Sequence, residues 1–259
     1  MLNNREAFIK VRNLKKVYGS KANPNIVLNA LNFDVTEGEF IGIMGASGSG
    51  KTTLLNLLST IDRATEGDIY YGQDNIAKMN DNEMADFRRK NLGFIFQDFN
   101  LLDTLTIEEN IMLALSINGE NKKEIKSQVD HVIKALGIEN VKDKFPYQVS
   151  GGQKQRCACA RAMVHHPKLV LADEPTGALD SKSSKQLLDA LRMMNEELGA
   201  TIFMVTHDAF SASYCNRILF LKDGMISYEL KRENKEQKTF FNEILDNLSF
   251  EGSEDTNAV

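Results

Sequence analysis

The stretch Gly45-Ala46-Ser47-Gly48-Ser49-Gly50-Lys51-Thr52 decides the fold, because it matches the phosphate-binding pattern G-x-x-x-x-G-K-[ST] in full. A short apolar run (39–45) precedes it, and TTLLNLLSTI (52–61) follows with the apolar spacing of a helix. Glycines let successive backbone N–H groups curl around phosphate oxygens, and a helix N-terminus adds partial positive charge. Strand, glycine-rich loop and helix in this order predict a phosphate site.

The residue types of this loop indicate separate roles. Lys51 is expected to reach the β- and γ-phosphates of a nucleotide, and Thr52 to offer its hydroxyl to Mg²⁺. ATP and Mg²⁺ are therefore the expected ligands. The candidate nucleotide-binding residues of the loop are Gly45, Ser47, Gly48, Gly50, Lys51, Thr52 and Thr53.

A second candidate element is LVLADE, an apolar run that ends in Asp173 and Glu174. Adjacent acids at the end of a buried strand are costly unless they meet a cation or a reacting group. Asp173 is expected to hold the metal shell and Glu174 to act as the general base that polarises the attacking water. The alternative is that both acids merely lead the strand into solvent.

The order of the apolar segments predicts a parallel α/β core. KLVLADEP (168–175) and TIFMVTHD (201–208) are typical of buried parallel strands, and residues 183–198 between them suit a crossover helix. Two alternating segments near the start, 7–19 and 26–35, predict half-buried strands. Residues 80–140 are polar and helix-prone, and we interpret them as a helical insert between sheet strands.

Composition excludes several classes of protein. The chain has 259 residues, 42% of them hydrophobic, and no apolar run long enough to span a bilayer. A cytoplasmic chain that reaches a membrane only through a partner is expected. The formal net charge of −5 disfavours a nucleic-acid binder. Three cysteines, an odd number, make a disulfide framework improbable, and we interpret them as small core residues.

The end of the chain changes character after residue 232. KTFFNEILDNLSF (238–250) spaces Phe240, Ile244 and Leu248 four residues apart, which predicts one apolar helical face. A helix packed back on the domain is the favoured interpretation, and a partner-binding helix is the alternative. The last residues, EGSEDTNAV (251–259), are typical of disorder.

Further segments resemble the ATPase subunits of ABC transporters. The run VSGGQ (149–153) opens a predicted helix and resembles the ABC signature, although Val149 stands where leucine is commonest. By the same physics as the phosphate loop, a serine and two glycines at a helix start would form a second anion cradle. The resemblance implies nucleotide contacts at Ser150, Gly152 and Gln153.

The remaining motifs of the family follow in order. Tyr18 is similar to the aromatic residue that stacks on adenine, and Gln97 matches the Q-loop, which senses the γ-phosphate and the metal. Asp180 lies in a segment similar to the D-loop, and His207 matches the switch histidine that contacts the γ-phosphate. The resemblance thus implies Glu174, His207 and Lys51 as catalytic residues. It implies Thr52, Gln97 and Asp173 as metal-site residues.

The phosphate loop and the signature would give one chain two anion cradles, although one γ-phosphate does not need both. A dimer explains why both are present. In the family, the signature of one subunit closes over the nucleotide on the partner's phosphate loop, with C₂ symmetry for a homodimer. The implied fold is an α/β P-loop NTPase of the ABC type, with a mainly parallel sheet, an antiparallel β subdomain and a helical subdomain. Residues 1–232 would form the ATPase domain, with the helical subdomain at about 98–165, and residues 233–259 a helix and tail.

Finer matches, such as IMGASGSGKTTLLNLLSTID (43–62) and HDAFSASYCNRILFLKDG (207–224), resemble the bacitracin-export type of peptide-antibiotic resistance ATPase. That type implies a transmembrane permease as partner and, through it, a sensor kinase. Lipoprotein-release or macrolide-efflux ATPases are the nearer alternative. A soluble ABC ATPase acting on nucleic acid or ribosomes is the distant one. A noncatalytic scaffold conflicts with the presence of both Glu174 and His207.

Overall fold

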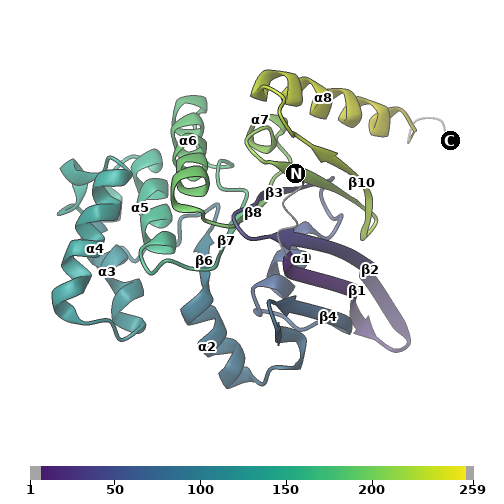
Figure 1. The fold of residues 1–259 in the computed structure, drawn as a ribbon, viewed down its shortest axis with the longest axis horizontal. Coiled ribbons are helices and arrows are strands. Elements are labelled where there is room, and N and C mark those ends of the chain that lie inside the picture. The colour runs from purple at the N-terminus through teal and green to yellow at the C-terminus, as the bar shows by residue number, and fades with distance from the viewer. Residues whose placement is uncertain (1–6, 255–259) are drawn as a thin grey trace.

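The computed structural model describes residues 7–254, apart from the side chains of residues 122, 123 and 250–254. Two sheets and a group of helices make up the fold (Figure 1). The larger sheet has six strands in the order β10-β9-β3-β8-β7-β6. Its strands are β3 (Phe40–Met44), β6 (Leu92–Ile95), β7 (Leu169–Asp173), β8 (Ile202–Val205), β9 (Arg217–Lys222) and β10 (Met225–Lys231).

The larger sheet is parallel except at one edge, where β10 pairs antiparallel with β9. Strands β3 and β8 and the first four residues of β7 are buried, as their continuous apolar runs predict for a sheet covered on both faces. The carboxyl ends of β3, β7 and β8 lead into the phosphate loop, Glu174 and His207. The sheet therefore delivers three candidate segments to one edge, as the predicted α/β class requires.

The prediction of a helical insert over residues 80–140 is wrong at one place. Helix α2 (Asp81–Asn91) is followed directly by β6, which pairs in parallel with β7. Four residues, LGFI, are too few to show a strand period in the sequence. Gly93 permits this strand to lie close to α5, because a Cβ atom there would lie 2.2 Å from the carbonyl oxygen of Ala162.

The smaller sheet is antiparallel, in the order β2-β1-β4-β5. The long predicted strands near the start appear in it as a pair. Its strands are β1 (Ala7–Ser20), β2 (Asn23–Thr36), β4 (Glu66–Tyr71) and β5 (Asp74–Asn75). Helix α1 (Lys51–Leu58) buries Leu54, Leu55 and Leu58 in the core that this sheet shares with β3. The phosphate-loop helix is thus held between the two sheets.

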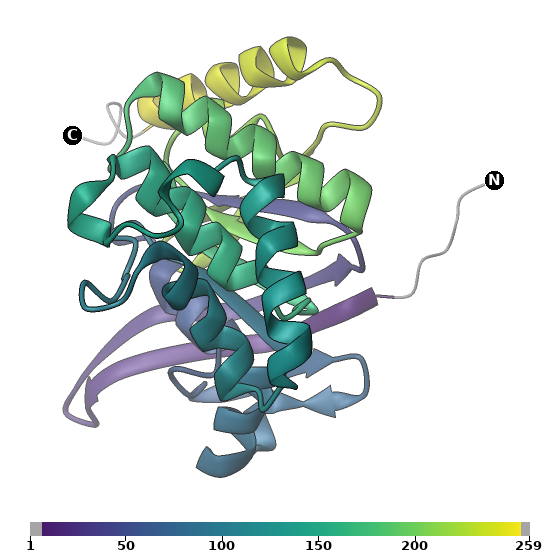
Figure 2. The same ribbon diagram turned by 90° about the vertical axis from the view of Figure 1, so that its left-hand side faces the viewer.

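The helical group lies on the side away from the smaller sheet and faces the viewer in Figure 2. Its contacts link α3 to both α4 and α5, and α5 to α6. The helices beyond α2 are α3 (Ile107–Ile117), α4 (Lys122–Ala135), α5 (Gly151–Met163), α6 (Ser181–Leu198) and α7 (Ala209–Ala212). Short 3₁₀ turns are η1 (Ile76–Lys78), η2 (Glu139–Val141) and η3 (Pro146–Gln148).

Helix α8 (Gln237–Glu254) closes the described part of the chain. Phe240 and Ile244 are fully buried in the core that the larger sheet shares with the helices, and Leu248 packs against this core. Four residues expected to be disordered, 251–254, continue the helix, since each residue added to a formed helix gains a hydrogen bond. The predicted disorder of residues 255–259 lies outside the described residues. The division of the chain at residue 232 stays a prediction.

Candidate nucleotide site

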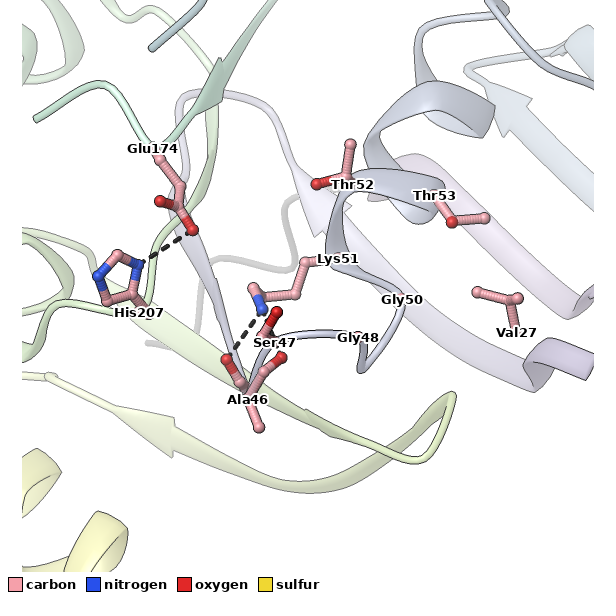
Figure 3. A pocket seen from close by; sticks show the side chains of 11 residues that line it. Val27, Ala46, Ser47, Gly48, Gly50, Lys51, Thr52, Thr53, Glu174 and His207 are labelled. Atoms are coloured by element: carbon pink, nitrogen blue, oxygen red, sulfur yellow. Dashed lines mark hydrogen bonds and ion pairs between the residues drawn. The ribbon is translucent and has the colours of Figure 1, made fainter. Parts of the chain in front are cut away.

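A cavity of about 710 Å³ lies over the phosphate loop (Figure 3). It gathers residues from the loop, from the end of β7 and from the end of β8. The predicted residues that line it are Gly45, Ser47, Gly48, Gly50, Lys51, Thr52, Thr53, Glu174 and His207. Two residues that sequence reasoning missed, Val27 and Ala46, line it as well.

The start of α1 is open to this cavity. Its N-cap is Gly50, which has no side chain to cap the helix, whereas Asn80, Thr106, Ser150 and Asp180 cap α2, α3, α5 and α6. An uncapped helix start presents unsatisfied N–H groups and a partial positive charge, so an anion fits there. Glycine is required at the cap because φ is +103° and a Cβ atom would lie 2.9 Å from the carbonyl oxygen of Val27.

Lys51 is the buried cation of the site. Its ammonium donates to the carbonyl oxygens of Gly45 and Ala46, at 2.9 and 2.7 Å. Burial lowers the pKa of Lys51, and the carboxylates of Glu174 and Asp173 act in the opposite direction. A buried ammonium that donates to two carbonyl oxygens is well suited to exchange one of them for a phosphate oxygen.

Glu174 and His207 meet across the cavity (Figure 3). The Nδ1 atom of His207 lies 3.0 Å from Oε1 of Glu174. An ionised carboxylate can only accept, so Nδ1–H of the imidazole donates. Glu174 adopts φ +43°, an unusual backbone conformation for this residue type, and its N–H donates to the carbonyl oxygen of Val205. The strand end therefore holds the carboxylate at the edge that carries His207.

Asp173 ends β7 directly before Glu174 and is half-buried. Burial is the main cause that raises its pKa, the charge of Glu174 adds to this effect, and Lys51 opposes it. The described residues hold no group of three or more His, Cys, Asp or Glu side chains suited to a metal. An all-protein metal cage is thus absent from the described chain, whereas one carboxylate, a threonine hydroxyl and phosphate oxygens fit the way Mg²⁺ is held beside nucleotides.

The predicted signature residues do not line this cavity. Ser150 is the N-cap of α5, where its Oγ accepts from the N–H of Gln153 and the Gln153 side chain accepts from the Ser150 N–H. Because Oγ acts as an acceptor there, its hydroxyl proton stays available to a further partner. In Figure 1, α5 belongs to the helical group, whereas α1 lies beside the smaller sheet.

The signature and the predicted D-loop form one packed unit. A Cβ atom at Gly152 would lie 2.7 Å from Oγ of Ser183, so this glycine lets α5 and α6 approach. The Ser183 hydroxyl donates to Asp180, whose other carboxylate oxygen caps α6 through the N–H groups of Lys182 and Ser183. The structure thus gives Gly152 a packing role that the sequence pattern did not reveal.

Gln97 and Tyr18 also lie outside the cavity lining. Gln97 follows β6, and its side-chain amide lies close to Gly177. A Cβ atom added at Gly177 would be 3.1 Å from that amide. A residue that sequence reasoning missed links these segments. Gln155 of α5 is buried and donates to the carbonyl oxygens of Phe96 and Pro175, which lie next to Gln97 and Glu174 in the chain. Only the fold brings α5 to both strand ends.

Comparison with known proteins decides the family. The family model described as ABC transporter matches residues 28–177. The chain belongs to the ABC transporter family. The match covers the phosphate loop, Gln97, the signature, and Asp173 and Glu174 in the order that the sequence resemblance gave, and that resemblance is confirmed.

Relatives at high identity share nearly the whole chain. The bacitracin export ATP-binding protein BceA of Halalkalibacterium halodurans is 50% identical over 239 residues, covering 92% of this chain and 94% of the relative. The uncharacterised ABC transporter ATP-binding protein YvcR of Bacillus subtilis is 50% identical over 248 residues, covering 95% of each chain. This family member therefore matches both relatives over more than nine tenths of each chain.

Solved structures confirm the predicted fold. The ATP-binding cassette MJ0796, whose sequence is that of a Methanocaldococcus jannaschii protein, was determined as a dimer in a post-hydrolysis state with ADP and Pi. It superimposes with a TM-score of 0.79 at 39% identity, covering 86% of this chain and 98% of MJ0796. A second dimeric structure of MJ0796 matches equally, at 40% identity.

Proposed function

We propose that this chain powers a membrane permease that exports peptide antibiotics of the bacitracin kind or confers resistance to them. It is an ATP-binding subunit of an ABC transporter and hydrolyses ATP. One observation supports the catalytic part most. Lys51, Glu174 and His207, from three separate segments, line one cavity at the uncapped start of α1.

The residue roles follow from that geometry. Lys51 would neutralise charge on the β- and γ-phosphates, and Glu174 would take a proton from the attacking water while His207 orients it. The hydrogen bond between Glu174 and His207 holds both side chains at the cavity edge. Mg²⁺, held by Thr52, Asp173 and Gln97, would supply charge neutralisation at the phosphate oxygens.

A second copy of the chain would complete the site. Ser150 and its helix start lie away from the cavity of their own chain, and the MJ0796 cassette is a dimer. We propose a head-to-tail pair in which Ser150, Gly152, Gln153 and Asp180 of one copy face the nucleotide of the other. Two nucleotides would then lie in the dimer interface, related by C₂ symmetry.

We propose that a partner supplies the membrane-spanning part. None of the helices in residues 7–254 has the length and apolar character that a bilayer crossing needs. By similarity to the transporter relatives, we propose a peripheral position on the cytoplasmic face of the membrane, bound to a permease and through it to a sensor kinase. The antibiotic specificity rests on the similarity to the bacitracin export relative.

Susceptibility measurements test the proposal. A host strain that lacks this chain should become more sensitive to bacitracin, and expression of the parent chain should restore resistance while Glu174→Gln should not. Erythromycin serves as the contrasting drug. Sensitivity that rises for erythromycin and stays constant for bacitracin would replace the proposal with the macrolide-efflux alternative.

A further inference from the structure

Asp62 connects two charged or polar side chains of β1. One carboxylate oxygen, Oδ2, accepts from the hydroxyl of Tyr18 at 2.6 Å, and Oδ1 accepts from the ammonium of Lys16 at 2.6 Å. Lys16 and Tyr18 are two residues apart on one strand and hence on the same face of it. The ammonium also lies over the Tyr18 ring, 4.6 Å from its centroid.

The Lys16 ammonium is buried, with 8% of the residue exposed, and its other partner is the carbonyl oxygen of Arg63 at 2.8 Å. A buried ammonium needs such partners, so its position beneath the ring is fixed. Burial acts to raise the pKa of Asp62, but hydrogen bonds from Lys16, Tyr18 and the Arg63 N–H outweigh it, and the pKa is lowered. The carboxylate is therefore held as an anion between the two side chains.

Asp62 belongs to the turn that ends α1. Its N–H donates to the carbonyl oxygen of Asn56, within the helix, at 3.1 Å. The same helix begins at Lys51 in the phosphate loop. One short rigid element thus joins the phosphate site to the carboxylate that fixes the phenol of Tyr18. Thr53, one of the residues that line the cavity, acts to lower the pKa of that phenol, whereas the hydrogen bond to Asp62 raises it.

We propose that Asp62, supported by Lys16, is a positioning residue that sets the Tyr18 ring at a fixed distance from the phosphate loop, so that the ring stacks on adenine. This proposal rests on the nucleotide-binding function proposed above. Lys16 covers one face of the ring, and a cation on one face withdraws electron density from it. A ring in that state is suited to stack its other face on an electron-rich purine.

The test compares ATP with inorganic tripolyphosphate, which carries phosphates but no base. Asp62→Ala should weaken ATP binding about two- to tenfold, the range of an aromatic stacking contact, and leave tripolyphosphate binding unchanged. Tyr18→Phe, which keeps the ring but loses the hydroxyl, should resemble Asp62→Ala. Calorimetry with Mg²⁺ present measures both ligands. Equal losses for ATP and tripolyphosphate would show that Asp62 supports the fold of α1, and the proposal would be overturned.

A double variant separates positioning from general damage. In the Tyr18→Ala background, Asp62→Ala should cost no further ATP affinity, because the residue acts through the ring. Additive losses contradict the proposal. If Tyr18→Ala alone leaves ATP affinity unchanged, the adenine role of Tyr18 fails first, a distinct result that also ends the role of Asp62.

Asp81→Ala is the matched control for Asp62→Ala. Asp81 is an exposed acid that pairs with Arg63, the neighbour of Asp62, at 2.7 Å and has no bond to Tyr18 among the described contacts. Both ligands should bind this variant as they bind the parent. A loss of ATP affinity equal to that of Asp62→Ala would show that any lost charge near this turn matters, which contradicts a specific role for Asp62.

Discussion

The starts of α1 and α5 differ in how their first N–H groups are satisfied. Helix α1 follows a glycine-rich turn and α5 begins with two glycines, and the sequence marks both starts as anion cradles. Gly50 leaves α1 without a side-chain cap and open to the cavity, whereas Ser150 and Gln153 cap α5 reciprocally. The first start is therefore open to an anion within a single chain. At the second start, the N–H groups of Ser150 and Gln153 are satisfied within the monomer, so a nucleotide on another copy would gain only the contacts that this capping leaves unused.

Glu174→Gln should produce the largest effect, on the rate of hydrolysis, and it tests how the starts of α1 and α5 work together. Glutamine keeps the shape of the side chain but cannot take a proton, so hydrolysis should fall by about 10²–10⁴ while ATP binding survives. Because hydrolysis no longer separates the copies, the two helix starts should stay joined in an ATP-bound dimer. Single-turnover hydrolysis, equilibrium binding and size analysis measure this. Hydrolysis within threefold of the parent at normal binding would remove Glu174 from the role of base.

Lys51→Ala tests the first start alone. The ammonium that now contacts two loop carbonyls would be lost to the phosphates, a charge-assisted contact worth about 1.5–3 kcal/mol, or roughly ten- to a hundredfold in Kd. Calorimetric titration with ATP checks it. Lys78→Ala, which removes an exposed lysine of the same charge, is the control and should bind normally. Unchanged affinity in Lys51→Ala would refute the phosphate-loop assignment.

Ser150→Arg tests the second start, with Ser150→Ala beside it. Arginine should block the approach of a second copy, so ATPase activity should fall about tenfold or more and the ATP-dependent dimer should disappear. ATP binding by the monomer should persist, since the cavity is lined by other residues. Ser150→Ala loses the cap and should cost about 1 kcal/mol of stability. If dimerisation and hydrolysis both survive Ser150→Arg, the signature does not face a partner nucleotide.

Sequence patterns predicted those parts of the fold and site that consecutive residues determine. The phosphate loop and the apolar strand ending in Asp173 and Glu174 follow from local spacing, and the parallel sheet follows from their order. Strand β6 was missed because four apolar residues carry no period.

Contacts between distant segments had no signal in the sequence. Asp62 meets Tyr18, and Gln155 meets two strand ends, only after the chain has folded. A pairwise contact of this kind leaves no mark on the spacing of a single segment. The roles carried over from the family to individual residues, those of Gln97 and Tyr18 among them, stay predictions.

Gly152→Ala should have the smallest effect, and it separates the two reasons for a glycine at the start of α5. The added methyl would lie 2.7 Å from Oγ and 3.0 Å from Cβ of Ser183, so crowding should destabilise the chain by about 1–3 kcal/mol. Thermal or denaturant unfolding measures this loss. Ser183→Gly removes both crowding atoms and, in the double variant, should recover most of the loss that crowding caused. The Ser183→Gly single variant supplies the reference, because it also gives up the hydrogen bond to Asp180.

The ATPase activity of the same double variant then decides what Gly152 does. If the glycine serves only the packing of α5 against α6, hydrolysis should return along with stability. If the glycine is also needed so that a partner's nucleotide can approach the backbone, stability should return while hydrolysis stays reduced, because the methyl group still occupies that approach. We expect stability to return while hydrolysis stays reduced. The start of α5 would then need a glycine for access to its backbone, as the start of α1 does, although the two helices are capped differently. Full recovery of hydrolysis would show that the glycine of α5 serves packing alone and that the likeness of the two starts is confined to their sequences.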